Sequence, residues 1–262
     1  TGHGQEGEFI PQNHYLNIDG GPQEYIWSVW TECADNPVFP QGGTWIYDRA
    51  GWCPGKASDL REDDITQLVT PGQTHNIDYG VSNATGVSNY WVSSQLVSYD
   101  DPNFSIDASI AEILSPTTSI KHFRRNPMCS KPEVVLQNTG SSTLTSVVIK
   151  YWINGGQQHT YNWSGNLDFL EKVEIELPDP TSLWSTINTS SSNKFYVEIF
   201  EVNSSTDQYS HNNLMTSAFE APASYPNTFA LWFETNSGVV NVATQQSENS
   251  WKFLNSDGNI LF

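Results

Sequence analysis

Short strand-like runs follow one another along this chain, separated by clusters of Gly, Pro, Asn, Asp and Ser. The clearest run is Lys172 to Leu177, where Val173, Ile175 and Leu177 alternate with charged residues. Strict alternation is the pattern of a strand with one buried face. No long helical period stands out, and only one short helical turn is expected, within Pro178 to Ile187. The sequence therefore predicts an all-β protein.

The chain has 262 residues, which is enough for more than one domain of ordinary size. The first region has four predicted strands, which are His14 to Asp19, Tyr25 to Trp30, Thr74 to Tyr79 and the long run Tyr90 to Tyr99. The letters SYDDPNFS at Ser98 to Ser105 then break the pattern. We predict a first domain over residues 1–99 and a linker over 100–105.

A second set of strand signals follows the linker. Its members are Glu133 to Gln137, Leu144 to Ile153, Gln157 to Trp163, Lys172 to Leu177 and Lys194 to Val202. Asn154-Gly155 predicts a type I′ hairpin turn, since both central residues of that turn need a positive φ. We predict an immunoglobulin-like or fibronectin-like β-sandwich over residues 106–222. A partial β module over 223–262 has strand candidates Phe229 to Glu234 and Ser250 to Leu254.

The charge balance limits the partners. The chain carries 29 acidic and 11 basic residues, a formal charge of −18. A surface of this sign repels phosphate backbones and anionic lipid headgroups, so nucleic acid and membrane surfaces are poor partners. Neutral glycans fit better, because aromatic stacking and hydrogen bonds recognise them, although a tryptophan outside the Pro40 to Gly55 loop more often fills a sandwich core. No apolar run is long enough for a membrane span.

Sixteen residues from Pro40 to Gly55, PQGGTWIYDRAGWCPG, combine glycines, aromatic residues, an Asp-Arg pair and a cysteine. With the preceding WTECADNPVF, this loop resembles the second jelly-roll domain of the peptide:N-glycosidase F family of secreted bacterial amidases, whose loop also ends in DRAGWCPG. The resemblance extends from Thr1 to about Tyr99. It implies a jelly roll that starts upstream of Thr1, followed here by the two β modules.

The resemblance also implies site residues. Glu8 falls on the family's active-site glutamate, although Glu6 and Ile10 replace the flanking cysteines. Arg49 and Glu8 are the predicted catalytic residues, with Arg49 as a fixed guanidinium donor. Three predicted substrate-binding residues are Trp52, His3 and Asp48, where His3 stands at the position of a cleft tryptophan. Three of these residues have alternative roles. Glu8 could be a solvated turn residue, Arg49 could hold the loop in place by pairing with Asp48 or another carboxylate, and Trp52 could pack on a disulfide.

Three cysteines are present. By resemblance to the family's bridged pair, Cys33 and Cys53 are predicted to form a disulfide, with two buried thiols as the alternative. Cys129 is left over, and a buried free thiol is favoured over a catalytic one because no His/Asn arrangement accompanies it.

No metal or cofactor is predicted. The acidic cluster Asp59, Glu62, Asp63 and Asp64 lacks the spacing of a calcium loop, which favours a solvated loop. His3 and His14 form no HxH or HExxH pattern. GxSxG, P-loop and dinucleotide motifs are absent, so serine-hydrolase and nucleotide chemistry are unsupported.

The resemblance implies part of a secreted amidase that hydrolyses the asparagine side-chain amide of N-linked glycoproteins. Its catalytic base would be an aspartate of an upstream jelly roll, so this chain alone is expected to be inactive. A Gram-negative bacterium would export it to its surface or beyond, with the type IX secretion pathway and surface-assembly proteins as further partners. The alternatives are a cell-surface glycan-binding or adhesion protein without catalysis, and a structural stalk of β modules.

Overall fold

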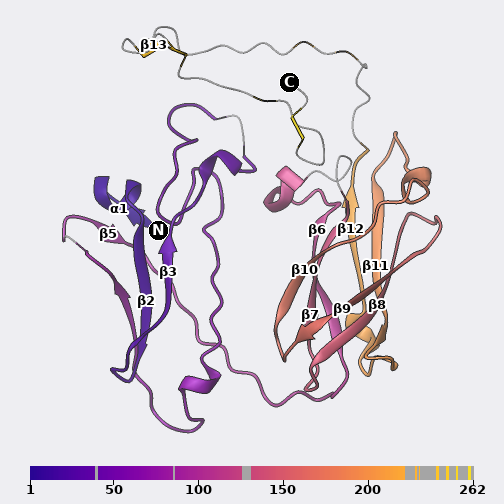
Figure 1. Ribbon diagram of the computed structural model, residues 1–262, viewed down its shortest axis with the longest axis horizontal. Coiled ribbons are helices and arrows are strands. Elements are labelled where there is room, and N and C mark those ends of the chain that lie inside the picture. The colour runs from indigo at the N-terminus through magenta and orange to yellow at the C-terminus, as the bar shows by residue number, and fades with distance from the viewer. Residues whose placement is uncertain are drawn as a thin grey trace.

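The computed structural model describes residues 1–38, 41–84, 86–125 and 131–221, and further on 228, 230, 240–241, 246–247, 252 and 259–260. Antiparallel strands make up nearly all of its regular structure, in two groups that lie side by side (Figure 1). The described residues contain one α-helix, the short α1 (Gln5–Phe9), which the sequence did not predict. The all-β prediction is confirmed. The predicted divisions at residues 99, 105 and 222 stay predictions.

The N-terminal group consists of two small antiparallel sheets. In the three-stranded sheet, β2 (Gln12–Ile18) lies between β3 (Gln23–Val29) and β4 (Ile77–Val81). β1 (Gly2–His3) pairs with β5 (Asn89–Tyr90). Three of the four strands predicted here are thus present, shifted by one to three residues. The described residues of this N-terminal group form five strands, whereas a complete jelly roll has eight.

The predicted strand Tyr90 to Tyr99 is wrong beyond its first residue. After β5 the chain has no regular secondary structure up to Asp100. Leu96 and Tyr99 are 76% and 66% exposed, so neither side chain lies against a sheet. Alternation gives a segment the preference for a strand, but the strand forms only where a neighbour accepts its backbone hydrogen bonds.

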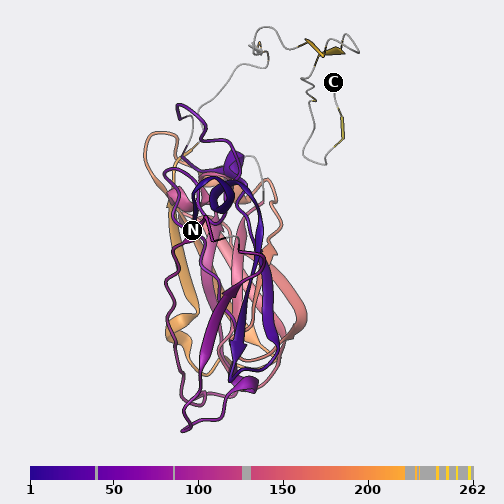
Figure 2. The same ribbon diagram turned by 90° about the vertical axis from the view of Figure 1, so that its left-hand side faces the viewer.

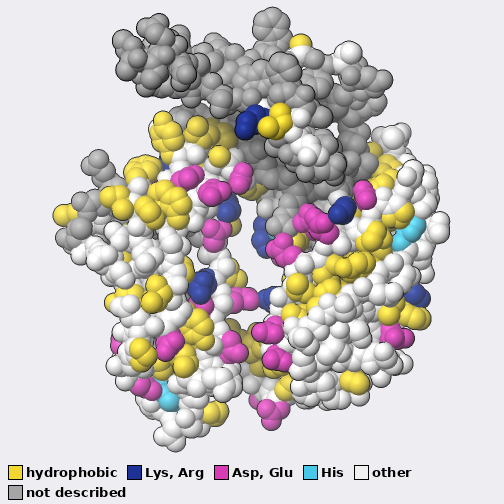
Figure 3. Space-filling view, viewed as in Figure 1, with side chains coloured by type: hydrophobic (Ala, Val, Ile, Leu, Met, Phe, Trp, Pro, Cys, Tyr) yellow, Lys and Arg dark blue, Asp and Glu magenta, His cyan; other side chains and the backbone are white. Residues whose placement is uncertain are grey.

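The N-terminal group has little hydrophobic core. Of its described residues, the buried hydrophobic ones are Ile18, Cys33, Ala50 and Cys53. By contrast, fifteen of the twenty described large hydrophobic side chains that are exposed lie in residues 1–99. Figure 3 shows hydrophobic side chains gathered on the upper part of this group. Exposed apolar surface on this scale is typical of a region that contacts another protein surface.

The second group is a two-layer sandwich. One sheet has the order β10-β7-β6 and the other has the order β12-β11-β8-β9. The strands are β6 (Ala108–Ser115), β7 (Glu133–Asn138), β8 (Leu144–Ile153), β9 (His159–Leu167), β10 (Lys172–Glu176), β11 (Asn193–Val202) and β12 (Leu214–Phe219). Their inward side chains form one continuous core that runs from Ala108 to Phe219. This is the predicted β-sandwich.

Most details of the sandwich follow the sequence patterns. β8 has the predicted bounds, and Ile175 and Leu177 are buried as the alternation requires. A 3-10 turn at Leu183–Thr186 is the predicted helical turn. The sequence missed β6 and β12. The type I′ turn is wrong, because Asn154 has a φ of 51° while Gly155 does not have a positive φ, and β9 starts only at His159.

The chain enters the sandwich through a tightly bonded segment. Gln208 Oε1 accepts hydrogen bonds from the backbone N–H groups of Ser105 and Ile106, at 2.9 and 3.0 Å. Next to this contact, Asp107 and Asp207 are both buried, and burial is the main cause that raises the pKa of Asp207. The end of the predicted linker is therefore part of the sandwich. Figure 2 shows the sandwich from the side of the N-terminal group.

Little of the third predicted module is described. It contributes the two-residue strands β13 (Val240–Asn241) and β14 (Gln246–Ser247), which pair with each other. The strand candidates Phe229 to Glu234 and Ser250 to Leu254 lie outside the described residues except for Ala230 and Lys252, and Cys129 lies outside them too.

Candidate functional site

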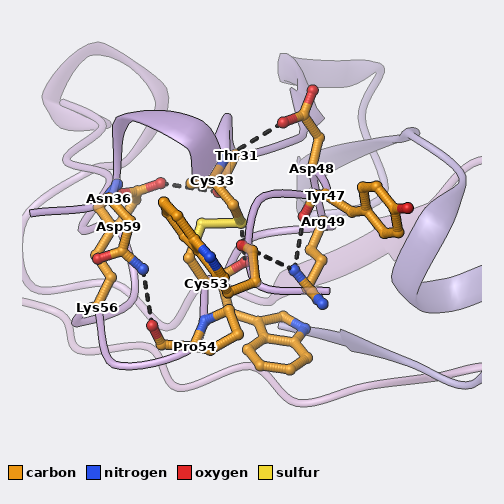
Figure 4. The surroundings of a disulfide bond; sticks show 12 residues. Thr31, Cys33, Asn36, Tyr47, Asp48, Arg49, Cys53, Pro54, Lys56 and Asp59 are labelled. Atoms are coloured by element: carbon orange, nitrogen blue, oxygen red, sulfur yellow. Dashed lines mark hydrogen bonds and ion pairs between the residues drawn. A yellow bond between two sulfur atoms is a disulfide. The ribbon is translucent and has the colours of Figure 1, made fainter. Parts of the chain in front are cut away.

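A disulfide joins Cys33 and Cys53, as the resemblance implied (Figure 4). Both cysteines are buried, and their Cα atoms are 5.4 Å apart. The bridge closes the loop that contains Asp48, Arg49 and Trp52. A two-way backbone contact between Thr31 and Arg49 lies beside it, with N···O distances of 2.7 and 3.1 Å. The covalent bond and this contact together fix the base of the loop.

Arg49 is the centre of the loop. Its side chain is only 4% exposed. Nε donates to Glu8 Oε1 at 3.0 Å, and the terminal nitrogens donate to the carbonyls of Tyr47, Trp45 and Thr44 and to the Thr44 hydroxyl. A guanidinium has five N–H donors, so all of them have an acceptor inside the protein. The charge is thereby satisfied in a buried position.

Glu8 lies at the end of α1, and its backbone is held on both sides. Its N–H donates to the Gly4 carbonyl at 2.7 Å, and its carbonyl accepts from Ala50 N–H at 2.9 Å. The side chain is 23% exposed. Among the described residues, only Oε1 has a hydrogen-bond partner, which is Arg49. Glu8 thus presents a partly exposed carboxylate in a fixed position.

Trp52 lies against the Arg49 guanidinium, and His3 lies against Trp52. The guanidinium carbon of Arg49 is 5.2 Å from the Trp52 ring centre, within the range of a cation–π contact. Trp52 Nε1 donates to the Gly2 carbonyl at 3.0 Å. The His3 ring stacks on Trp52, with ring centres 5.9 Å apart. The structure therefore brings Glu8, Arg49, Trp52 and His3 together.

Asp48 has a different position. Its carboxylate accepts a hydrogen bond from the backbone N–H of Cys33 at 3.2 Å. This contact ties Asp48 to the disulfide rather than to Arg49, whose carboxylate partner is Glu8. The alternative of an Asp48–Arg49 pair is therefore not the one that the structure adopts.

The predicted acidic cluster is dispersed among separate partners. Asp59 pairs with Lys56, Asp63 with Arg61 and Glu62 with Lys172, at 2.6 to 2.8 Å. Asp64 accepts the backbone N–H of Thr66. The described residues contain no group of three or more His, Cys, Asp or Glu side chains placed to hold a metal ion. None of their helices is long and apolar enough to cross a membrane.

His14 belongs to the core of the first sheet rather than to the site. It is 1% exposed, packs against Trp27, Tyr79 and Tyr90, and Nδ1 bonds to the Tyr79 hydroxyl. Burial is the main cause that lowers the pKa of His14 from 6.5 to about 4. The folded protein therefore holds this imidazole in its neutral form at neutral pH.

A pH prediction follows from this shift. Between pH 6.5 and 4 the unfolded chain binds a proton at His14 that the folded chain does not bind. The free energy of unfolding should thus fall by about 3 kcal/mol as the pH drops through that window. Chemical unfolding at a series of pH values measures it. A His14→Gln variant should lose this part of the slope, and an unchanged slope in the variant would refute the assignment.

Sequence reasoning missed one residue next to the site. Trp91 was expected as part of a strand, but its ring centre lies 4.8 Å from that of His3. Its backbone pairs with Thr1, which is far away in sequence. Only the pairing of β1 with β5 reveals this neighbourhood, and no local pattern in the sequence signals it.

Comparison with known proteins finds a family match over the region that contains this loop. Residues 1–97 match the model of the family described as peptide-N-glycosidase F, C terminal. A stretch of 48 residues, 18% of this chain, is 44% identical to peptide-N(4)-(N-acetyl-beta-D-glucosaminyl)asparagine amidase F of Elizabethkingia miricola. That match spans only 13% of the relative's length.

Among solved structures, a domain of a protein described as a cell surface protein, from Methanosarcina acetivorans, aligns with a TM-score of 0.34 and 14% identity. The alignment covers 47% of this chain and 96% of that domain. The family match rests on the N-terminal region instead. The first 97 residues of this chain are thus similar to the C-terminal part of peptide-N-glycosidase F.

Proposed function

We propose that this chain supplies one half of the active site of a secreted amidase that hydrolyses the side-chain amide of N-glycosylated asparagine. The observation that carries the proposal is the fixed, partly exposed carboxylate of Glu8, paired with buried Arg49 at 3.0 Å. The family match over residues 1–97 supports the substrate class. The disulfide supports an oxidising, extracytoplasmic location.

The reaction needs a base near the attacking water, a donor near the leaving nitrogen and donors for the developing oxyanion. Water adds to the amide carbon, the carbon–nitrogen bond breaks, and the nitrogen leaves with a proton as a glycosylamine. Glu8 can accept hydrogen bonds from the sugar or the amide N–H through Oε2. The base would be an acidic residue of an upstream jelly roll, as the resemblance implies.

Arg49 acts as a positioning residue in this proposal. All five of its N–H donors are bound inside the protein, so none is left to stabilise an oxyanion. Its effect is to hold the Glu8 carboxylate and the loop over Thr44 to Tyr47 in one arrangement. The role differs from the fixed donor that the resemblance suggested.

The upstream domain is the proposed partner of part of the exposed apolar surface of residues 1–99, a part that does not include Trp91. Side chains such as Ile26, Tyr47 and Val97 are 55%, 57% and 61% exposed. Burial of such surface against a second β domain would stabilise both, by about 25 cal/mol for each Å² of apolar area. The same contact would bring the catalytic base close to Glu8. The sandwich and the module after it serve as accessory modules.

A second candidate is a surface protein that binds glycans without hydrolysis. The observation that favours it is that every N–H donor of Arg49 is already bonded inside the protein. This half of the site therefore offers an aromatic surface and a hydrogen-bond acceptor but no free cationic donor. The fold alone does not decide between the two.

Mass spectrometry of an N-glycopeptide incubated with the parent protein distinguishes the amidase from the glycan-binding protein. We expect asparagine to become aspartate, and Glu8→Gln to slow the conversion by about two orders of magnitude or more. Glu32→Gln is the matched control, since Glu32 is an exposed glutamate that takes no part in the hydrogen bonds of Glu8 and Arg49, and it should leave the rate unchanged. An intact glycopeptide across several glycan types would favour the binding protein.

A further inference from the structure

Five side chains form a continuous row that leads from the candidate site to the surface. It starts at Glu8, which bonds to Arg49 at 3.0 Å. The Arg49 guanidinium lies 5.2 Å from Trp52, which stacks on His3 at 5.9 Å. His3 in turn contacts Trp91 at 4.8 Å. Arg49 within the row is buried, Glu8 at one end is partly exposed, and Trp91 at the other end is open to solvent.

Trp91 is exposed but held in place. It is 74% exposed, although large aromatic side chains are rarely left so open. Its backbone N–H donates to the Thr1 carbonyl and its carbonyl accepts from the Thr1 backbone nitrogen, both at 2.9 Å. His3 contacts one side of the indole at an interplanar angle of 46°. The position is thus prearranged, which lowers the entropy cost of binding a ligand.

We propose that Trp91, supported by His3, forms a stacking face for a neutral sugar ring of the substrate glycan. The choice of ligand rests on the proposed function above, while the surface itself rests on the contacts. An indole face carries negative charge density and attracts the polarised C–H groups on one face of a pyranose ring. Hydroxyl or acetamido groups of the sugar can bond to His3 Nδ1, which has no partner among the described residues.

Charge favours a neutral sugar over an acidic one. The nearest cation of the row, Arg49, is buried and fully bonded, so it cannot pair with a sugar carboxylate. Glu8 and the formal charge of −18 would repel such a group. N-acetylhexosamines meet these conditions because they are uncharged and have an apolar face.

Calorimetric titration of the parent protein with N-acetylglucosamine oligomers of one to four rings tests the proposal. These probes lack asparagine, so they bind without being hydrolysed as amide substrates. Trp91→Ala should weaken binding by about tenfold or more, as is typical for a central tryptophan, and Trp91→Phe should restore most of it. Leu96→Ala is the matched control, since Leu96 is 76% exposed in the same segment, and should bind like the wild type.

Equal affinity of the wild type and Trp91→Ala would overturn the proposal, and so would an equal loss in Leu96→Ala or no binding by the wild type. The amidase proposal is judged separately, by conversion of a glycopeptide. If the oligomers bind through Trp91 but no glycopeptide is converted, the stacking-face proposal is supported and the amidase proposal is rejected. If the glycopeptide is converted and Trp91→Ala leaves the KM of that reaction unchanged, the amidase proposal is supported and the stacking-face proposal is rejected.

Discussion

Replacement of Arg49 by methionine is expected to destabilise the N-terminal region by about 3 kcal/mol or more, because breaking a buried ion pair leaves its partners unsatisfied. Glu8 Oε1 and the carbonyls of Thr44 and Tyr47 would lose their donors. Amide hydrogen exchange within residues 1–97 measures the effect separately from the sandwich, which unfolds as its own core.

Arg61→Met is the matched control for Arg49→Met. Arg61 also forms an arginine–carboxylate pair, with Asp63, but its side chain is 43% exposed. Pairs with an exposed partner contribute about 0–1 kcal/mol, so this variant should lose much less stability than Arg49→Met, although Arg61 also lies 4.6 Å from the Trp27 ring centre. Arg49→Lys should fall between the two, because lysine keeps the charge and loses the planar fork. Similar losses at Arg49 and Arg61 would contradict the central role of the Arg49 network.

Removal of the disulfide is expected to have an effect of similar size. The bridge joins residues 20 apart in sequence, and a ring of that length constrains the unfolded chain by about 3 kcal/mol. A Cys33→Ser/Cys53→Ser double variant should lose this stability, together with protection of the amides around Asp48 and Arg49. Denaturant unfolding of the N-terminal region, with and without a thiol reductant, provides the measurement.

Cys129→Ser supplies the control, since Cys129 is not part of this bridge. That variant should respond to the reductant as the wild type does, whereas the double variant should show no response. A wild-type protein whose unfolding is insensitive to the reductant would show that the loop does not depend on its covalent closure.

The strands of the sandwich could be predicted because one face of each is buried within the same domain. β8 and β10 show this, with inward residues such as Ile149 and Ile175 at strand spacing. The run Tyr90 to Tyr99 has a comparable pattern, but beyond Tyr90 it pairs with no strand among the described residues. Local periodicity reports a preference for a strand, and the rest of the fold decides whether a partner is available.

The candidate site was predictable only in part. The loop letters and the resemblance identified Glu8, Arg49, Trp52 and the disulfide, all of which the structure places around one loop. The sequence could not indicate that Arg49 donates its hydrogen bonds to carbonyls of its own loop, because these bonds depend on the backbone path over Thr44 to Tyr47. Trp91 joins through strand pairing between distant segments, which no short motif encodes.

The most direct test of the amidase proposal is hydrolysis of an N-glycopeptide by the parent protein in water enriched in the heavy oxygen isotope. If water attacks the side-chain amide, mass spectrometry should find aspartate at the former glycosylation site, carrying one heavy oxygen, and the released glycan should retain its innermost N-acetylglucosamine. Release of a glycan that leaves N-acetylglucosamine on asparagine, or no release at all, would contradict the proposal.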